Sequence, residues 1–569
     1  MDDFMRYQME RVATEFSTGW FACLPSEDLD FEEALEYIQK HPYDDFMHKY
    51  LLDLTGTFGP NLVDLLINKG KEDDPYLLAL MYETFILNEK LQALRTRFDG
   101  VDVKQLAEYT PHIYINWILR QNQADNLYWV RLFSENIYGH NPLPSPEYLE
   151  RPVPFDRNAI EDWRARVVPI EDVLTERDRR VSQKSPVPGL TPEETAKRAM
   201  EKLKARDLVA GREMGTQASL GPYALQIPWK LDITVSVGRN RWRLTGIQTS
   251  YGKGLNVHEA RASCLMEMIE RYSAFASFRS DRIPGYKTGH PIIKAPFKDL
   301  VKTGHNALDP NDMNLEVPYQ NQELYWIPAE RADENGRYPI YVPAQLVFLF
   351  CNLDEISLSS GLPSSGLAAG NTLEEAKLNA LLEVIERDAE RIMPYSRERC
   401  FLLEADDPRV RDILKGCAEK GIHVQLLDIT PEFGIPCYKA FIQGPRGEIL
   451  KGCGAGLDGK RAAVSALTEV PYSHSQQPCS VPAPEGIRTI KYEELPDYAS
   501  GNVGEDLRLL ERLLLMNGYH PIYVDLTRAD LDIPVARVLV PGLEMITDFD
   551  RFSSLSIRQF AHSGYCNVT

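Results

Sequence analysis

Two segments of the sequence carry acidic and basic side chains at matching positions, 116 residues apart (254 and 370). In a helix, these positions (i, i+4, i+8, i+11 and i+12) share one face. Clustered carboxylates suit Mg²⁺, which commonly bridges phosphates, and arginine suits phosphate oxygens. The pattern therefore predicts a magnesium–nucleotide site and phosphoryl-transfer chemistry. The matching positions are Glu259, Ser263, Glu267, Glu270 and Arg271, then Glu375, Asn379, Glu383, Glu386 and Arg387.

A third, degraded copy begins at Gly456 and keeps the glycine, alanine and leucine of the pattern together with Glu469. Its later Glu-Arg pair is replaced by Tyr472 and Ser473, and Pro471 should end the helix there. Glutamates on three converging helices repel one another until a metal neutralises them. The metal ligands that we predict are Glu267, Glu270, Glu383, Glu386 and Glu469.

A solvated charged face is the alternative interpretation of each helix on its own. We favour a site because the acidic stripe recurs with fixed spacing while the apolar side is less strictly repeated. The segment 454–461 is close to a phosphate-binding loop, but Arg461 stands where that loop needs a hydroxyl, so we reject that interpretation. The glycine turn Gly252-Lys253-Gly254 is equally compatible with an anion-facing turn and with a plain turn.

The elements that must position these residues divide the chain into three parts. Residues 1–140 show apolar residues at helical spacing and predict an all-α domain. Residues 141–188 are rich in proline and charge and predict an extended, partly ordered connection. From 189 to 569, strand-like and helical segments alternate, which predicts an α/β domain. Its first helix has a capping hydroxyl and proline at Thr191-Pro192.

Each copy of the acidic pattern reads as a strand, a glycine turn and a helix, so the α/β domain is predicted to consist of repeated βα units. A second duplication supports this: residues 423–430 resemble residues 521–527. Each of these follows a predicted helix, near 407–420 and 504–517 respectively. We interpret them as paired scaffold strands.

Composition excludes several classes of protein. The net charge of −20 disfavours nucleic-acid binding, which needs clustered Lys and Arg. No apolar run reaches the roughly 18–20 residues that cross a bilayer, and the acidic start is unlike a secretory signal. Nine cysteines are scattered without a C-x-x-C pair, which argues against disulfides or structural zinc. We therefore expect a cytoplasmic protein without membrane or nucleic-acid partners.

At this point the motifs resemble those of the YcaO family, ATP-using enzymes that modify peptide backbones. Ser263, Glu267, Glu270 and Arg271 match S-x-x-x-E-x-x-E-R, and residues 375–387 resemble E-x-x-x-[QN]-x-x-x-E-x-x-E-R. The resemblance covers about 185–560 and implies ATP and Mg²⁺ as cofactors. It also implies phosphorylation of an amide oxygen of a peptide or protein substrate, leading to a thioamide or azoline. The residues implied to bind the cofactors are Lys253, Ser263, Glu267, Glu270, Arg271, Glu375, Asn379, Glu383, Glu386, Arg387 and Glu469.

The chain departs from the family pattern in three respects. The third motif, R-x-x-x-E, has Ser465 in place of arginine, and Arg461 lies one turn earlier. The proline-rich C-terminal tail of azoline-forming members is absent, and residues 1–140 are unlike a precursor-binding domain. These differences favour a stand-alone role, such as thioamidation or assistance of a ribosomal-protein modification. We assign no catalytic residue.

Four alternatives for function and assembly stay open. A nucleotide-binding scaffold without turnover and a carboxylate–amine ligase are the other candidate functions. The N-terminal helical region is a candidate docking site for a partner protein, and a homodimer is a further candidate assembly.

Overall fold

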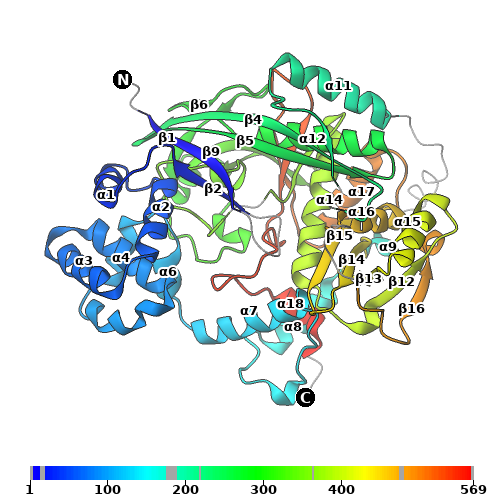
Figure 1. Ribbon diagram of the computed structural model, residues 1–569, viewed down its shortest axis with the longest axis horizontal. Coiled ribbons are helices and arrows are strands. Elements are labelled where there is room, and N and C mark those ends of the chain that lie inside the picture. Colours follow the sequence, from blue (N-terminus) through cyan, green and yellow to red (C-terminus); the bar gives the residue numbers. More distant parts are fainter. Residues whose placement is uncertain are drawn as a thin grey trace.

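The computed structural model describes residues 4–12, 20–174, 189–216, 219–361, 364–472 and 480–565 (Figure 1). Three sheets of five or six strands form the framework, and helices cover them. The predictions made for Ser473 and for the charged stretch at 176–180 lie outside the described residues. Among the described residues, no helix combines the length and apolarity needed to cross a bilayer.

The first sheet is built on a long antiparallel hairpin, β4 (Tyr223–Val237) and β5 (Asn240–Gly254), with β3 (Met214–Gly215) at one edge. Helix α12 (Val257–Ala274) follows β5 and packs back onto it, and α11 (Pro192–Ala205) packs against α12. The predicted start of α11 is confirmed. Glu194 N donates to Thr191 Oγ1 at 3.2 Å, and Thr191 N donates to the Glu194 carboxylate at 2.8 Å.

Two strands near the N-terminus extend this sheet, where we had expected only helices. Strand β1 (Met5–Val12) lies parallel to β5 with Tyr7 opposite Leu244, and β2 (Trp20–Pro25) lies antiparallel to β1. Tyr7 and Met9 are buried while their neighbours are exposed, which is the alternation of a half-buried strand. The physical reason for the difference is that β1 pairs with the edge of β5, whose residues lie 237 positions later in the sequence (Tyr7 opposite Leu244).

The helical domain expected near the N-terminus begins after β2. It contains α1 (Phe31–Lys40), α2 (Asp45–Gly56), α3 (Pro60–Asp73), α4 (Pro75–Leu87), α5 (Val103–Leu106), α6 (Tyr114–Ile118) and α7 (Gln123–Ile137). Helix α4 is apolar on nearly all sides and is buried at the centre of this group. Figure 1 shows α1 to α4, in blue, beside one end of the first sheet, whereas α7, in cyan, lies next to α8 (Arg157–Arg166) and α18 (Ile557–Ser563).

The second sheet lies in the order β10-β9-β17-β18-β11, with β8 also paired to β9. Helix α14 (Leu373–Ile392) follows β11 and packs onto β11 and β18, and α17 (Val503–Met516) packs against α14. The strands are β8 (Ile293–Pro296), β9 (Glu323–Asp333), β10 (Gly336–Pro343), β11 (Leu367–Ala369), β17 (Ile522–Asp525) and β18 (Val535–Leu539). Nearby lie α13 (Phe297–Lys302) and the small pair β6 (Arg282–Ile283) and β7 (His290–Pro291).

The third sheet lies in the order β15-β14-β13-β12-β16. Helix α16 (Gly459–Glu469) follows β15 and packs onto β15 and β14. The strands are β12 (Cys400–Glu404), β13 (Gln425–Asp428), β14 (Cys437–Gln443), β15 (Ile449–Ala455) and β16 (Arg488–Lys491). All three copies of the acidic pattern are therefore a strand followed by a helix, as predicted.

The second duplication is also confirmed as scaffold. β13 follows α15 (Pro408–Glu419) and pairs antiparallel with β14, while β17 follows α17 and pairs antiparallel with β18. The two copies lie in different sheets, and each sheet carries one of the acidic helices.

The described part of the connection predicted at 141–188, residues 141–174, contains helices as well as extended segments. It contains α8 (Arg157–Arg166) and α9 (Ile170–Val173), and α8 contacts the C-terminal helix α18 (Ile557–Ser563). Ile160 and Ile170 are fully buried, and Ile170 N donates to Phe433 O at 2.8 Å. The prolines that indicated a linker instead separate short segments whose apolar residues join the core of the α/β domain.

Candidate functional site

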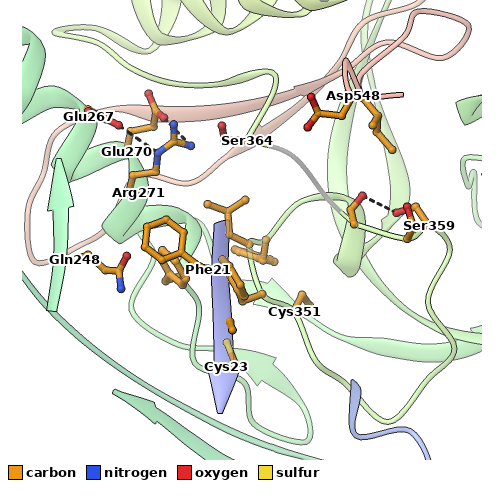
Figure 2. A pocket seen from close by; sticks show the side chains of 18 of the residues that line it. Phe21, Cys23, Gln248, Glu267, Glu270, Arg271, Cys351, Ser359, Ser364 and Asp548 are labelled. Atoms are coloured by element: carbon orange, nitrogen blue, oxygen red, sulfur yellow. Dashed lines mark hydrogen bonds and ion pairs between the residues drawn. The ribbon is translucent and has the colours of Figure 1, made fainter. Parts of the chain in front are cut away.

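One cavity of about 1720 Å³ collects the side chains of all three acidic helices. Figure 2 shows Glu267, Glu270 and Arg271 together on its wall. Carboxylates that lie up to 200 residues apart in sequence thus face one space. The predicted residues that line the cavity are Lys253, Ser263, Glu267, Glu270, Arg271, Glu383, Glu386, Arg387 and Glu469.

On α12, hydrogen bonds and ion pairs fix the acidic side chains. Glu267 accepts a hydrogen bond from Tyr251 N at 2.8 Å, which ties the helix to β5. Arg271 lies 3.4 Å from Glu270 and 3.8 Å from Glu267, so its guanidinium is held between two carboxylates. Asn256 caps the helix by accepting from two backbone N–H groups.

On α14, Arg387 occupies the position equivalent to Arg271. Its two Nη atoms lie 3.5 Å from Glu386 and 3.3 Å from Glu390. Glu390 also forms an ion pair with Lys451 of β15. Burial alone would raise the pKa of Glu390, but Lys451, Lys439 and Arg387 together lower it to about 2. Glu390 is therefore held ionised and fixes the position of Arg387.

On α16, Glu469 contacts the glycine turn of the first sheet. Lys253 Nζ lies 2.7 Å from Glu469 Oε2, which joins the first and third repeats across the cavity. Ser465 also lines the cavity. Arg461 is not among the lining residues, and its charge instead acts on Asp506. Arg461 therefore does not occupy the space left by the serine.

Glu375 and Asn379, which we predicted to bind the cofactors, do not line the cavity. Glu375 accepts a hydrogen bond from Asn371 N at 3.0 Å, and the equivalent Glu259 accepts from Leu255 N at 2.9 Å. This repeated glutamate satisfies a backbone donor at the turn before each helix, which explains its recurrence structurally. Asn379 is exposed on α14.

The glycines have a packing role. A Cβ at Gly252 would lie 2.1 Å from Ala260 O, and one at Gly454 would lie 2.2 Å from Ala462 O. Only glycine lets these strands approach the helices that follow them. Residues 252–254 belong to β5, and Gly454 lies within β15, so both glycines are strand residues that pack against a helix.

The buried carboxylates have strongly perturbed pKa values. Burial raises the pKa of Glu270 well above its usual range; Arg271 opposes this and Glu383 adds to it. Burial likewise raises the pKa of Glu383, and it raises that of Glu386 to about 7. Several carboxylates that raise the pKa of neighbouring carboxylates in a concave site are typical of a cation-binding site.

Arg537 on β18, a cationic side chain close to Glu383 and Glu270, was not identified from the sequence. This residue is fully buried, and burial lowers its pKa to about 10 while Glu383 and Glu270 oppose that shift. Its Nε donates to Leu346 O at 3.3 Å. The signal was available, because an arginine in the middle of the apolar run 535–539 is unusual for a buried strand.

The side chains of the cavity suit a metal ion that binds together with phosphate. They do not form a complete set of protein ligands for a metal on its own. Within the described part of the chain, no group of three or more His, Cys, Asp or Glu side chains is already placed to hold a metal ion. Mg²⁺ is usually held by one or two carboxylates plus phosphate oxygens and water. Carboxylates on separate helices, with Lys253, Arg271 and Arg387 beside them, suit that division of ligands.

Comparison with known proteins agrees with this geometry. The sequence model of the YcaO cyclodehydratase family, described as binding ATP and Mg²⁺, matches residues 251–477 and 471–544. The chain belongs to the YcaO family. ATP and Mg²⁺ are accordingly the ligands of this YcaO domain, and the match contains the retained motif residues of the three acidic helices.

Two curated relatives are similar to parts of this chain. A protein of Methanothermobacter thermautotrophicus is 33% identical over 333 residues, covering 52% of this chain and 82% of that protein. An uncharacterised protein in the tfuA 3' region of Rhizobium leguminosarum bv. trifolii is 27% identical over 220 residues, covering 32% of this chain and 52% of that protein.

Solved structures that are similar to this chain include a heterocyclase and a YcaO protein. A heterocyclase in complex with substrate and cofactor is 21% identical with a TM-score of 0.49, covering 66% of this YcaO chain and 56% of that chain. A YcaO protein from Methanopyrus kandleri bound with AMPPCP and Mg²⁺ is 25% identical with a TM-score of 0.44, covering 62% and 91% respectively. The match thus spans little more than half of the heterocyclase.

The raised pKa of Glu386 predicts a pH dependence of nucleotide binding. Below pH 7 this carboxyl is mainly protonated and must lose its proton to bind a metal. The affinity for MgAMPPNP should therefore rise by up to about tenfold per pH unit below pH 7 and level off above pH 8. Calorimetry in two buffers of different ionisation enthalpy measures the released proton. Glu386→Gln should remove the proton release, and an unchanged release would contradict the assignment.

Proposed function

We propose that this protein uses MgATP to activate a backbone amide of a peptide or protein by phosphorylating the amide oxygen. The observation that carries the proposal is one cavity lined by Lys253, Arg271 and Arg387 together with the carboxylate cluster, defined as Glu267, Glu270, Glu383, Glu386 and Glu469. Bound MgATP supplies the phosphoryl group that turns the amide oxygen into a leaving group. A thiol, hydroxyl or sulfide nucleophile then gives an azoline or a thioamide.

The side chains divide the work by charge. Glu383 lies close enough to Glu270 to raise the pKa of that carboxyl, so a divalent cation held by these carboxylates would relieve their repulsion. Arg271 and Arg387 are held by neighbouring carboxylates and present their remaining N–H groups to phosphate oxygens. Lys253, oriented by Glu469, adds a mobile positive charge at the glycine turn. Most of the catalysis is then positioning and charge neutralisation.

A nucleotide-binding scaffold without turnover is the second candidate. It is favoured by Ser465 in place of the family arginine and by the end of α16 at Glu469, before a second Glu-Arg pair. The ion pair between Lys253 and Glu469 favours the enzyme, because it restores a cation next to the third helix.

Oxygen-isotope transfer separates these candidates. A library of end-blocked hexapeptides labelled with ¹⁸O at the backbone carbonyls is incubated with the protein, MgATP and sulfide. If an amide oxygen is phosphorylated, the released phosphate carries one ¹⁸O. Binding of MgAMPPNP without labelled phosphate would favour the scaffold. Label that comes only from peptides with a free ¹⁸O carboxylate would favour a carboxylate–amine ligase.

A further inference from the structure

The cavity is larger than a nucleotide site requires. Pockets for a single small ligand usually measure about 300–1,000 Å³, and this cavity measures about 1720 Å³. Beyond the carboxylate cluster it continues along the inner face of the first sheet. We call this part the apolar chamber, defined by Phe21, Cys23, Gln248, Phe275, Phe350 and Cys351. Figure 2 shows Gln248, Phe21 and the Glu270–Arg271 pair around the same space.

The N-terminal strands build one wall of the apolar chamber. β1 lies beside β5, and β2 lies beside β1, so Phe21 and Cys23 continue the inner face that carries Gln248. Phe21 remains 39% exposed although it is a large apolar side chain. Phe275, which is 5% exposed, stacks with Phe350 at a ring-centroid distance of 5.6 Å, so the uncovered aromatic surface of the chamber belongs mainly to Phe21. The chamber therefore presents aromatic surface that the chain itself does not cover.

The side-chain amide of Gln248 supplies a polar group to the chamber. Gln248 is 5% exposed, and its Nε2 has no hydrogen-bond partner among the described residues. A buried amide donor without a partner costs about 1–3 kcal/mol, so such groups are usually satisfied by a ligand or water. Gly246, two residues earlier on β5, leaves space beside the amide: a Cβ there would lie 3.6 Å from Nε2.

We propose that the apolar chamber binds the peptide substrate beside the activated amide, taking an apolar or aromatic side chain while Gln248 Nε2 donates to a backbone carbonyl. This inference rests on the proposed function for its substrate class. It assigns the N-terminal hairpin β1–β2 a role in substrate selection. Gln248 acts as a binding residue, and its hydrogen bond holds the peptide next to the carboxylate cluster.

Photolabelling of the full chain with MgAMPPNP bound tests this inference. The probe is the end-blocked tripeptide acetyl-Gly-X-Gly-amide, where X is p-benzoylphenylalanine. We expect labels to map to the chamber, and acetyl-Gly-Phe-Gly-amide to compete at least tenfold better than acetyl-Gly-Asp-Gly-amide. Label outside the chamber, or equal competition, would overturn the inference. Failure of the wild-type protein to bind MgAMPPNP would instead overturn the proposed function.

Two variants with matched controls separate binding from folding. Phe21→Ser should lower labelling at least tenfold with MgAMPPNP affinity unchanged, whereas Tyr338→Ser, an equally exposed aromatic outside the cavity, should not. Gln248→Leu should lower labelling while the melting temperature stays equal or rises, because an unpaired buried donor is removed. Gln8→Leu on the outer face of β1 is its control.

Two results with these variants would contradict the inference. A lower MgAMPPNP affinity in Phe21→Ser would mean that the chamber holds the nucleobase. A lower melting temperature of Gln248→Leu with unchanged labelling would mean that Gln248 is structural.

Discussion

Replacing Glu383 by glutamine is expected to lower the affinity for MgAMPPNP by about 100-fold, or about 2.7 kcal/mol. Glu383 is the central member of the carboxylate cluster, since its pKa is affected by Arg387, Arg271 and Arg537 and it in turn raises the pKa of Glu270. Glutamine keeps the shape but removes the charge that a cation needs. Titration calorimetry with MgAMPPNP measures the loss.

The control for this variant lies on the same helix. Glu374→Gln changes an exposed glutamate at the start of α14, outside the cavity, and should leave the affinity unchanged. Circular dichroism should show that both variants keep the helical content of the parent protein. Wild-type affinity in Glu383→Gln would remove this residue from the metal site.

Replacing Arg558 by methionine is expected to destabilise the fold by about 3–5 kcal/mol. Arg558 on α18 makes a bidentate ion pair with Asp388 at 2.5 and 2.6 Å and also contacts Glu432. Arg558 and Asp388 are 3% and 0% exposed, so the variant leaves a carboxylate buried without its partner. Because Asp388 follows Arg387, this pair also fastens the C-terminal helix to the acidic helix of the site. Urea unfolding and hydrogen exchange of α18 measure the effect.

A surface pair and a double variant complete this test. Arg508→Met removes the exposed ion pair with Glu505 and should cost less than about 1 kcal/mol. Adding Asp388→Leu to Arg558→Met should restore part of the lost stability, since the uncompensated charge is then gone. If Arg558→Met were as stable as Arg508→Met, the buried pair would not hold α18 in place.

The sequence predicted the acidic helices well because a repeated pattern carries two kinds of information. The matching positions of Glu267 and Glu383 revealed the duplication, and the helical period placed them on one face. Convergence of three helices on one cavity followed from treating the copies as one structural unit. Glu375 and Asn379 do not line the cavity: Glu375, like Glu259, recurs because it accepts a backbone hydrogen bond at the turn, and Asn379 is exposed.

Other features depend on contacts that no local pattern encodes. The strands β1 and β2 form because β5, far along the chain, offers an edge with which β1 can pair. The alternation of buried residues in β1, Tyr7 and Met9, is short, and the helical pattern that follows it dominated the prediction for this region. Prolines at 142–154 indicated a linker, but Ile160 and Ile170 pack into the α/β domain. Arg537 is unusual within the apolar run 535–539, but its sequence position alone did not show that it lies near Glu383 and Glu270.

The arrangement of the N-terminal region ties it to the proposed chemistry. Residues of β2 and α2 line the same cavity as the carboxylate cluster, including Phe21 and Lys49. The region is therefore a wall of the proposed active site, which gives a reason for its attachment to a YcaO domain. A partner-docking role for its outer helices stays a prediction.

The central claim is that the acidic helices share one metal–nucleotide site. A crystal structure of the protein with MnAMPPNP, using the anomalous signal of Mn²⁺ in place of Mg²⁺, tests it most directly. We predict metal peaks about 2.1–2.2 Å from carboxylate oxygens of the cluster, with γ-phosphate oxygens near Arg271 and Arg387. Nucleotide bound elsewhere, with no metal among Glu267, Glu270, Glu383, Glu386 and Glu469, would contradict it.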